Sequence, residues 1–325
     1  MARRLFYLLA VASAIAPAVA LAQPTTTYVL PRAAGGPTLA PAPSGPAPDL
    51  AFGAFQRGYY ITALDEAMKA IAANPRDSAA MTLIGELYRT GEGIKPDGAE
   101  AERWYRLAAD LGDRAARFEL GLMLLTGEGG VAKDRAAAAA LFEQSAAQGH
   151  AGALYNLGVM AIEGDENAKP DFARAADLFK RAAELGDGDA AYSYGELLRS
   201  GRGVDLDTEE AARWIKRSAD AGVVAGEVDY AIMLYNGEGV MRDETAAAKL
   251  FGRAAARNNP IAQNRLAHLY AIGRGVKQDL AEAAAWNMLA EKAGIKDAQL
   301  DSLTSDLTPK QRAEMLDIVR GQAEF

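Results

Sequence analysis

The chain contains no cysteine. This absence excludes disulfide bonds, thiolate nucleophiles and a lipid-modified N-terminal cysteine. Histidine is scarce as well, because His150 and His268 are the only two and neither lies in a metal-binding spacing. The Gly-x-Ser-x-Gly, Ser-x-x-Lys and phosphate-loop patterns are also missing. The sequence therefore offers no catalytic residue, no metal site and no cofactor site, and we expect a protein that is not an enzyme.

The sequence also lacks a basic stripe and a long apolar run. Its net charge is −8 and its pI is near 5.1, so a nucleic-acid partner is not expected. An apolar run at residues 5–16 follows Arg3 and Arg4 and precedes the small-residue pattern Ala20-Leu21-Ala22. This run is shorter than the roughly 20 residues of a membrane span, and its flanks are typical of a secretory signal.

We therefore expect residues 1–22 to be a cleaved signal peptide, with an uncleaved membrane anchor as the alternative. No comparable apolar run follows, so no stable membrane insertion is expected after cleavage. The predicted location is the bacterial periplasm, and secretion beyond it is possible.

Proline is concentrated in one segment. Seven of the 13 prolines lie within residues 23–48, and such a composition cannot bury enough apolar surface to offset its chain entropy. We expect a disordered linker there. Residues 49–78 then resemble the second half of a tetratricopeptide repeat, with Gly58 in the turn, Ala63 and Ala70 at close helix contacts, and Pro75 after the second helix. A helical hairpin is expected over this range.

A block of 36 or 37 residues then recurs six times between Ala79 and Ile295. Each copy predicts a helix A, a glycine-containing loop and a helix B, and a period of this length is typical of a solenoid. The loop glycines are Gly91, Gly127, Gly164, Gly201, Gly237 and Gly273. Helix B should begin at an aspartate N-cap, namely Asp97, Asp134, Asp171, Asp207, Asp243 or Asp279. It should end at Gly112, Gly149, Gly186, Gly222, Asn258 or Gly294, which tolerate a left-handed conformation.

Three further details of the repeats lead to predictions. Glu100, Glu210 and Glu282 stand three residues after the N-cap aspartate and strengthen the signal for the start of helix B. The centre of helix A always holds a small residue, which suggests that a neighbouring helix lies against its backbone, with backbone-to-backbone contact at this position. These small residues are Gly85, Gly121, Gly158, Gly195, Ala231 and Ala267. Repeat 3 departs from the loop pattern, because its sequence from Gly164 to Asn167 has no second glycine.

The remaining residues, 296–325, predict capping helices. Thr308, Pro309 and Gln311 combine an N-cap, a first-turn proline and a capping-box glutamine. A terminal repeat needs such a cover over its apolar end.

The repeats resemble the Sel-1-like repeat family, a relative of the tetratricopeptide solenoids. The segments that carry the resemblance are 153–158 (Ala-Leu-Tyr-Asn-Leu-Gly), 235–240 (Tyr-Asn-Gly-Glu-Gly-Val), 207–212 and 217–222. The resemblance implies an all-α fold, a right-handed α/α superhelical solenoid of Sel-1-like and tetratricopeptide-like helical hairpins that serves as an adaptor. Bacterial members are often exported, and some resemble periplasmic regulators that restrain a sensor kinase. A cysteine-rich subgroup is linked to β-lactam binding, but this chain lacks those cysteines.

A residue that binds a partner should vary between copies, whereas a recurring residue serves the fold. Two positions that flank the small residue of helix A vary in this way, and we expect them to form one stripe. Their mixture of acidic, amide and apolar groups suits a protein or peptide partner, and an ordinary solvated helix face is the alternative. The candidate partner-binding residues are Glu86, Glu119, Leu122, Asn156, Val159, Ser193, Glu196, Asp229, Ile232, Arg265 and His268.

The sequence thus predicts a non-enzymatic periplasmic scaffold that binds an envelope protein through its solenoid surface. A regulator that restrains a sensor kinase and a cell-wall-related enzyme or ligand binder remain alternatives. His150 follows Gly149 and is expected near the C-terminus of a helix B, where a positive charge is tolerated.

Overall fold

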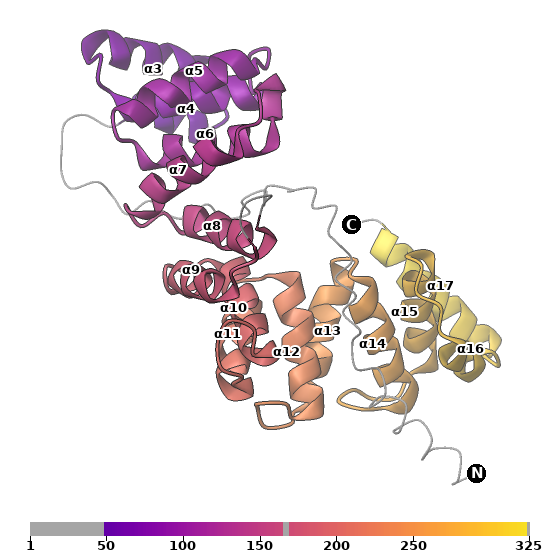
Figure 1. Ribbon diagram of the computed structural model, residues 1–325. Coiled ribbons are helices and arrows are strands. Elements are labelled where there is room, and N and C mark those ends of the chain that lie inside the picture. Colours follow the sequence, from indigo (N-terminus) through magenta and orange to yellow (C-terminus); the bar gives the residue numbers. More distant parts are fainter. Residues whose placement is uncertain (1–48, 165–168, 324–325) are drawn as a thin grey trace. The chain divides into compact units, whose positions relative to one another are not determined.

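The computed structural model describes residues 49–164 and 169–323. Within these ranges every regular element is a helix and no strand is present, which confirms the all-α class (Figure 1). None of the described helices is both long and apolar enough to cross a membrane. The predicted signal peptide and linker, residues 1–22 and 23–48, lie outside the described residues.

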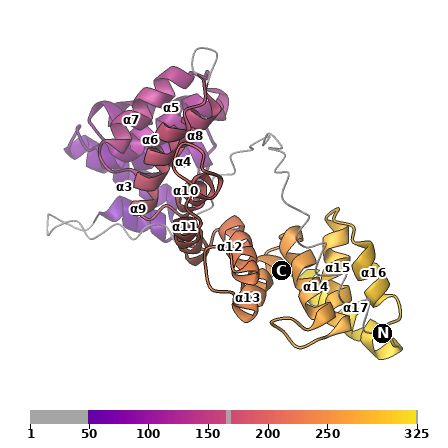
Figure 2. The same cartoon turned by 60° about the horizontal axis from the view of Figure 1, so that its bottom comes forward.

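The chain forms a series of helical hairpins, each packed against the next, and Figure 2 shows the same succession from a second direction. The first hairpin consists of α2 (Leu50–Gln56) and α3 (Tyr60–Ala73). Six hairpins follow, each a helix A and a helix B. They are α4 (Ser78–Thr90) with α5 (Gly98–Asp110), α6 (Arg114–Thr126) with α7 (Arg135–Ala146), and α8 (Ala151–Glu163) with α9 (Phe172–Glu184). The last three are α10 (Gly188–Ser200) with α11 (Thr208–Asp220), α12 (Val224–Asn236) with α13 (Glu244–Ala256), and α14 (Pro260–Ile272) with α15 (Leu280–Lys292).

Both ends of helix B are fixed as the sequence predicts. Each of the six aspartates accepts a hydrogen bond from backbone N–H groups of the first turn, as Asp134 does from Ala137 at 2.8 Å. All six terminating residues have a positive φ, and Asn258, at 62°, is the one described residue other than glycine that does.

The glutamates that follow the N-cap aspartates mark the start of helix B, but their side chains do not complete capping boxes. The N–H of Asp207 donates to the carbonyl of Leu198, at the end of the preceding helix A, so it is not free for Glu210. Glu210 instead accepts from Trp214 Nε1 at 2.7 Å, and Glu282 accepts from Trp286 Nε1 at 2.9 Å. These glutamates therefore hold the core tryptophans and do not close the cap.

The small residue at the centre of helix A lies in close contact with a neighbouring helix, as predicted. The contact is made by a side chain of that helix and not by its backbone. The space beside the glycine is filled by a helix-B side chain, and a ring fills it in three of the four glycine repeats. A Cβ added at Gly158 would lie 2.6 Å from Phe179 Cε1, and one at Gly121 would lie 2.7 Å from Phe142 Cε1. The helices therefore approach through a glycine and a flat ring, and backbone-to-backbone contact is not the main feature.

Backbone-to-backbone contact occurs elsewhere, in the loops. The second glycine of the Gly-x-Gly loop lies on the first turn of the preceding helix B. A Cβ added at Gly239 would lie 2.1 Å from the carbonyl oxygen of Thr208, and one at Gly203 would lie 2.3 Å from the carbonyl carbon of Phe172. Each such loop therefore locks one repeat onto the one before it, and only glycine fits there.

Repeat 3 has no second glycine in its loop sequence, and a side chain takes over the connection. Arg135, the first residue of α7, donates from Nη2 to the carbonyls of Met160 and Gly164 at 3.3 and 3.1 Å. Its Nη1 lies 2.8 Å from Glu163 Oε2. Arg135 thus joins repeat 2 to the C-terminal end of α8.

Two helices follow the sixth repeat, α16 (Ala298–Thr304) and α17 (Pro309–Ala323). Asp297 caps α16 by accepting from the N–H groups of Gln299 and Leu300 at 3.1 Å. Before α17, Thr308 and Gln311 exchange the two hydrogen bonds of a capping box. Leu300 is completely buried, so α16 contributes to the core at this end.

Candidate functional site

The eleven predicted partner-binding residues lie on the six A helices, but they do not form one exposed stripe. Leu122 and Asn156 are 8% and 7% exposed, so the prediction that they contact a partner is wrong. Asn156 donates from Nδ2 to the carbonyl of Gly152 at 2.8 Å. Val159 and Ile232 are half-buried and pack against the core.

The acidic members of the set gather around two arginines. In the first cluster, Arg89 holds Glu86 in a two-pronged ion pair, with Nη2–Oε1 at 2.8 Å and Nε–Oε2 at 3.1 Å. Arg89 Nη1 also lies 3.2 Å from Oε1 of Glu128, which belongs to the following loop. The hydroxyl of Tyr105 donates to Glu86 at 2.8 Å. Two repeats therefore contribute to this cluster.

Glu119 completes the first cluster from α6. It is half-buried, and burial raises the pKa of its carboxyl to about 7. Arg89 acts in the opposite direction, whereas Glu86 and Glu128 raise the pKa further. This carboxyl is therefore about half protonated at neutral pH.

The second cluster surrounds Arg199 on α10. Arg199 holds Glu196 in a two-pronged pair at 2.8 and 2.7 Å. Asp229 on α12 accepts from the hydroxyl of Tyr192 at 2.9 Å. Burial raises the pKa of Asp229, and the charges of Glu196 and Glu238 act in the same direction.

The two clusters occupy equivalent positions in repeats that lie three apart. Glu86 and Glu196 each follow the central glycine of helix A, and an arginine stands three residues later in both. The next helix A contributes Glu119 or Asp229, and the next loop contributes Glu128 or Glu238 within a Gly-Glu-Gly sequence. Each cluster therefore contains three carboxyl groups and one guanidinium.

Four members of these clusters were not among the residues predicted from the sequence, namely Arg89, Glu128, Arg199 and Glu238. The repeated Glu-x-x-Arg spacing on α4 and α10 was the available signal, because residues three apart face each other on a helix. Glu128 and Glu238 were not recognised because the glycines on either side of them already accounted for the loop conformation.

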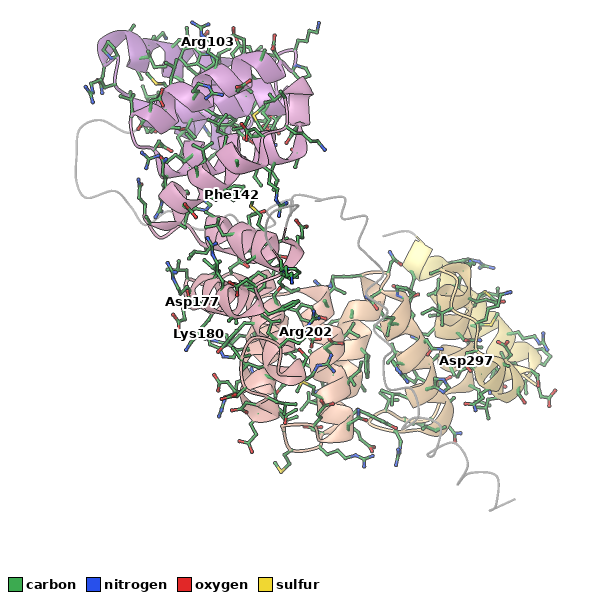
Figure 3. All side chains as sticks on the ribbon, viewed as in Figure 1. Arg103, Phe142, Asp177, Lys180, Arg202 and Asp297 are labelled. Carbon is green, nitrogen blue, oxygen red and sulfur yellow. The ribbon has the colours of Figure 1, made fainter. Side chains whose placement is uncertain are left out.

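The last members of the predicted set have other roles. Ser193 donates to the carbonyl of Asp189, one turn earlier on its own helix, at 2.9 Å. His268 Nε2 lies 2.7 Å from Asp297 Oδ2, which also accepts from Asn264 at 3.0 Å. Asp297 is labelled beside the C-terminal helices in Figure 3. Burial acts against its ionisation, but the bonds from Asn264, the Leu300 N–H and His268 hold its pKa below the usual value. His268 thus binds the C-terminal cap, and Arg265 on the same helix is half-buried.

His150 was expected to be a loop residue near the end of a helix B, where a positive charge is tolerated. In the structure it is instead a neutral residue at the start of the next helix A. Its Nδ1 accepts from the N–H of Ala153 at 3.2 Å, so it is the N-cap of α8 and must be neutral to act as one. Its ring stacks on Phe118 with centroids 4.3 Å apart. Burial, with a contribution from the charge of Arg114, lowers the pKa of His150 to about 4.

The described part of the chain contains no group of three or more histidine, aspartate or glutamate side chains that could hold a metal ion. The geometry of the two acidic clusters suits contact with cationic side chains. The clusters share the Glu-x-x-Arg ion pair but differ in their other contacts, because Glu128 pairs with Arg89 directly, whereas Glu238 acts on Arg199 only through its charge.

The comparisons with known proteins identify the family. The Sel1 repeat pattern matches residues 78–113, 114–150, 151–187, 188–223, 224–259 and 260–286, so the chain belongs to the Sel1 repeat family and has six of its repeats. The chain is similar to a Sel1 repeat protein from Oxalobacter formigenes, with 34% identity and a TM-score of 0.67, over 75% of this chain and 98% of that one. Sel1 repeats generally mediate protein–protein interactions.

A second structure supports the fold alone. The chain resembles c5321, a protective antigen of uropathogenic Escherichia coli strains displaying an SLR fold, with 24% identity and a TM-score of 0.51. The match covers 82% of this chain and 64% of that one. No curated protein matches the chain.

Proposed function

We propose that this protein is a non-enzymatic scaffold of the bacterial periplasm that binds another envelope protein through the two acidic clusters on its A helices. The observation that carries the proposal is the repetition, at Arg89 and Arg199, of a Glu-x-x-Arg ion pair with carboxyl groups of the next repeat around it. A fold requirement would place the arrangement in every repeat, whereas two copies three repeats apart suit a partner that contacts two places.

The charges indicate the chemistry of the partner. In each cluster the arginine is held by one glutamate on its own helix, and the remaining carboxyl groups come from the next repeat. When all of them are ionised, each cluster has two negative charges in excess. Lysine or arginine side chains of a partner would neutralise this excess, and such contacts should weaken as salt is added.

Glu128 and Glu238 offer the cleanest test because both lie outside the α-helices, Glu128 in the short 3-10 helix η1 (Glu128–Gly130) and Glu238 in a loop. We expect the double variant Glu128→Gln and Glu238→Gln to lose the partner that the wild-type protein captures after crosslinking in the periplasm. The matched control is Glu143→Gln with Glu184→Gln, two exposed glutamates on B helices. Capture that survives in the first variant, or that disappears equally in the control, would remove the clusters from the proposed mechanism.

The identity of the captured protein decides between the related functions. A sensor kinase that is derepressed when the gene is deleted would assign the scaffold to signalling. Turnover of peptidoglycan fragments or β-lactams by the purified protein would instead support an enzyme and oppose the proposal.

The periplasmic part of the proposal rests on residues 1–22. Fractionation of cells, with N-terminal sequencing of the purified protein, should find a mature chain that begins near Gln23 in the periplasmic fraction. An intact N-terminus in the cytoplasm would refute that part and leave the docking surface untouched.

A further inference from the structure

The junction between repeats 4 and 5, where α12 packs against α11, differs from the other junctions (Figure 2). In the other five A helices the third residue after the N-cap is a buried alanine, namely Ala80, Ala116, Ala153, Ala190 or Ala262. Repeat 5 has Gly226 at this position. A Cβ added to Gly226 would lie 2.5 Å from Ser218 Oγ and 2.9 Å from the backbone nitrogen of Ala219. The two helices therefore meet here without the methyl group that the other repeats place at the start of helix A.

The N-cap of α12 differs as well. Val223 makes no side-chain cap bond, whereas the N-cap side chains of the other five A helices each accept from an N–H of the first turn. The backbone of Val223, with φ −71° and ψ 120°, is nearly the same as that of the N-cap Asp113, with φ −65° and ψ 121°. Only the side chain of Val223 is therefore unsuited to a cap, and the first turn of α12 is held less firmly than its equivalents.

Ser218, near the end of α11, has a completely buried hydroxyl without a hydrogen-bond partner. Ser145 occupies the same position in repeat 2, and its hydroxyl donates to the carbonyl of Arg114 at 2.7 Å. A buried hydroxyl without a partner has lost its hydrogen bonds to water and gained none in return. Ser218 therefore favours separation of α11 from α12, because separation returns its hydroxyl to water.

The apolar core is interrupted at the same junction. The buried side chains of repeats 1 to 4, from Met81 to Trp214, form one cluster, and those from Val228 to Leu300 form a second. Between these clusters lies a small group of three residues, Ala212, Ile215 and Met233. Apolar burial, which is the main stabilising term in a fold, is therefore limited across this junction.

Polar contacts add to the closure of the junction. The hydroxyl of Tyr192 on α10 donates to Asp229 on α12 at 2.9 Å. Arg257, which follows α13, donates from Nη1 to the carbonyl of Gly222 at the end of α11, at 2.7 Å. Hydrogen bonds of this kind exchange for bonds to water with only a small net change in free energy. They close the junction and also allow it to open.

We propose that the solenoid has a hinge between α11 and α12, which divides it into two units that open and close as wholes. The first unit comprises the described residues up to Asp220, and the second comprises residues 224–323. The stability of stacked repeats is approximately a sum of terms for each repeat and for each interface, so one weak interface separates two cooperative units. The glycine, the missing cap, the unpaired hydroxyl and the divided core all weaken this one interface.

The hinge crosses the second acidic cluster. Glu196 and Arg199 belong to the first unit, whereas Asp229 and Glu238 belong to the second. Opening therefore divides the second cluster, while the first cluster, carried by repeats 1 and 2, stays whole. For a partner that docks on both clusters, a step that rests on the function proposed above, full binding requires the closed hinge.

Hydrogen exchange of the full chain, followed by mass spectrometry at low urea concentrations, tests the hinge without a partner. The second unit has only two repeats, so we expect its amides in α12 to α15 to share one opening and to exchange at least about tenfold faster than those in α6 to α9. The step in protection should lie between peptides of α11 and α12. Equal protection on both sides, or a step at another junction, would overturn the proposal.

Two substitutions repair the junction. Val223→Asn supplies the kind of cap that Asn259 gives α14, and Ser218→Ala removes the unpaired hydroxyl. Each should slow exchange in α12 to α15 about fivefold and leave α6 to α9 unchanged. Ser145→Ala is the matched control, because it removes a hydroxyl that is already paired and should slow exchange nowhere. Failure of both repairs to slow exchange in α12, or equal slowing by Ser145→Ala, would refute the hinge.

Gly226→Ala tests the link to docking, because its Cβ has no room beside the backbone of Ala219 unless the hinge opens. With a photo-crosslinking amino acid in place of Thr90 or Ser200, this variant should lose the partner product from position 200 and keep it from position 90. An undiminished product from position 200 would overturn the coupling. In the wild type, a step in exchange with no product from either position would support the hinge and reject the docking surface. Products from both positions without a step would reject the hinge alone.

Discussion

Gly158 provides a direct test of how helix A packs on helix B. A Cβ at this position would lie 2.6, 2.8 and 3.1 Å from three ring atoms of Phe179, whose ring is 1% exposed. Glycine inside a helix costs about 0.5–1 kcal/mol relative to alanine, so propensity alone favours Gly158→Ala. Overpacking a buried site costs about 1–3 kcal/mol and should outweigh that gain. We therefore expect Gly158→Ala to lower the free energy of unfolding by about 1–2 kcal/mol and Gly158→Leu by about 3 kcal/mol.

Gly252 is the matched control, because it lies inside α13 and an added Cβ would meet no atom within 4 Å. Gly252→Ala should raise the free energy of unfolding by about 0.5–1 kcal/mol. Urea denaturation followed by circular dichroism measures both variants, and Gly158→Ala combined with Phe179→Leu should recover part of the loss. A Gly158→Ala protein that is as stable as the wild type would show that the glycine–ring contact is not a tight one.

Three other predictions concern buried or half-buried charges. The folded pKa of His150 is about 4, below its ordinary 6.5, so its contribution to stability is complete above pH 6.5 and is lost as the pH falls toward 4. Asparagine caps a helix but does not titrate. The free energy of unfolding should therefore fall by about 1–2 kcal/mol less between pH 7 and 4.5 in His150→Asn than in the wild type. An equal fall in both proteins would contradict this. The folded pKa of Glu119 is about 7, above its ordinary 4.5, so stability is lost as the pH rises through 7. Glu119→Gln should therefore be more stable than the wild type by about 1–2 kcal/mol at pH 8 and by little at pH 4.5, and equal stability at pH 8 would refute it. Glu227 is 3% exposed and forms ion pairs with Arg253, at 3.2 Å, and with Arg257. Glu227→Gln should therefore lower the free energy of unfolding by about 2 kcal/mol in urea melts. An unchanged free energy would mean that these ion pairs do not stabilise the fold.

The fold was predictable because the features that fix it recur in every copy. The aspartate before helix B and the glycine or asparagine after it act locally, so their roles follow from the sequence alone. The neighbour of Gly158 was not predictable in the same way. Helical periodicity identifies the face that is buried, but it does not tell which side chain of another helix fills the space.

The candidate site was less predictable because it joins residues from different repeats. Glu86 and Arg89 are three apart, but Glu128 reaches them from a loop 39 residues later than Arg89. Leu122 is buried although its equivalents in other repeats are half-buried, and small differences in helix packing of this kind leave no mark in the sequence. His268 was predicted to contact a partner, but its Nε2 lies 2.7 Å from Oδ2 of Asp297, which belongs to the C-terminal cap.

A photo-crosslinking amino acid placed beside the two clusters tests the central claim most directly. Thr90 and Ser200 are exposed and follow Arg89 and Arg199, whereas Gln144 and Lys180 are exposed on B helices. We predict that a single protein is crosslinked in the periplasm from positions 90 and 200 and that positions 144 and 180 give no such product. The same product from the helix-B positions, or no product from either cluster, would contradict the proposed docking surface.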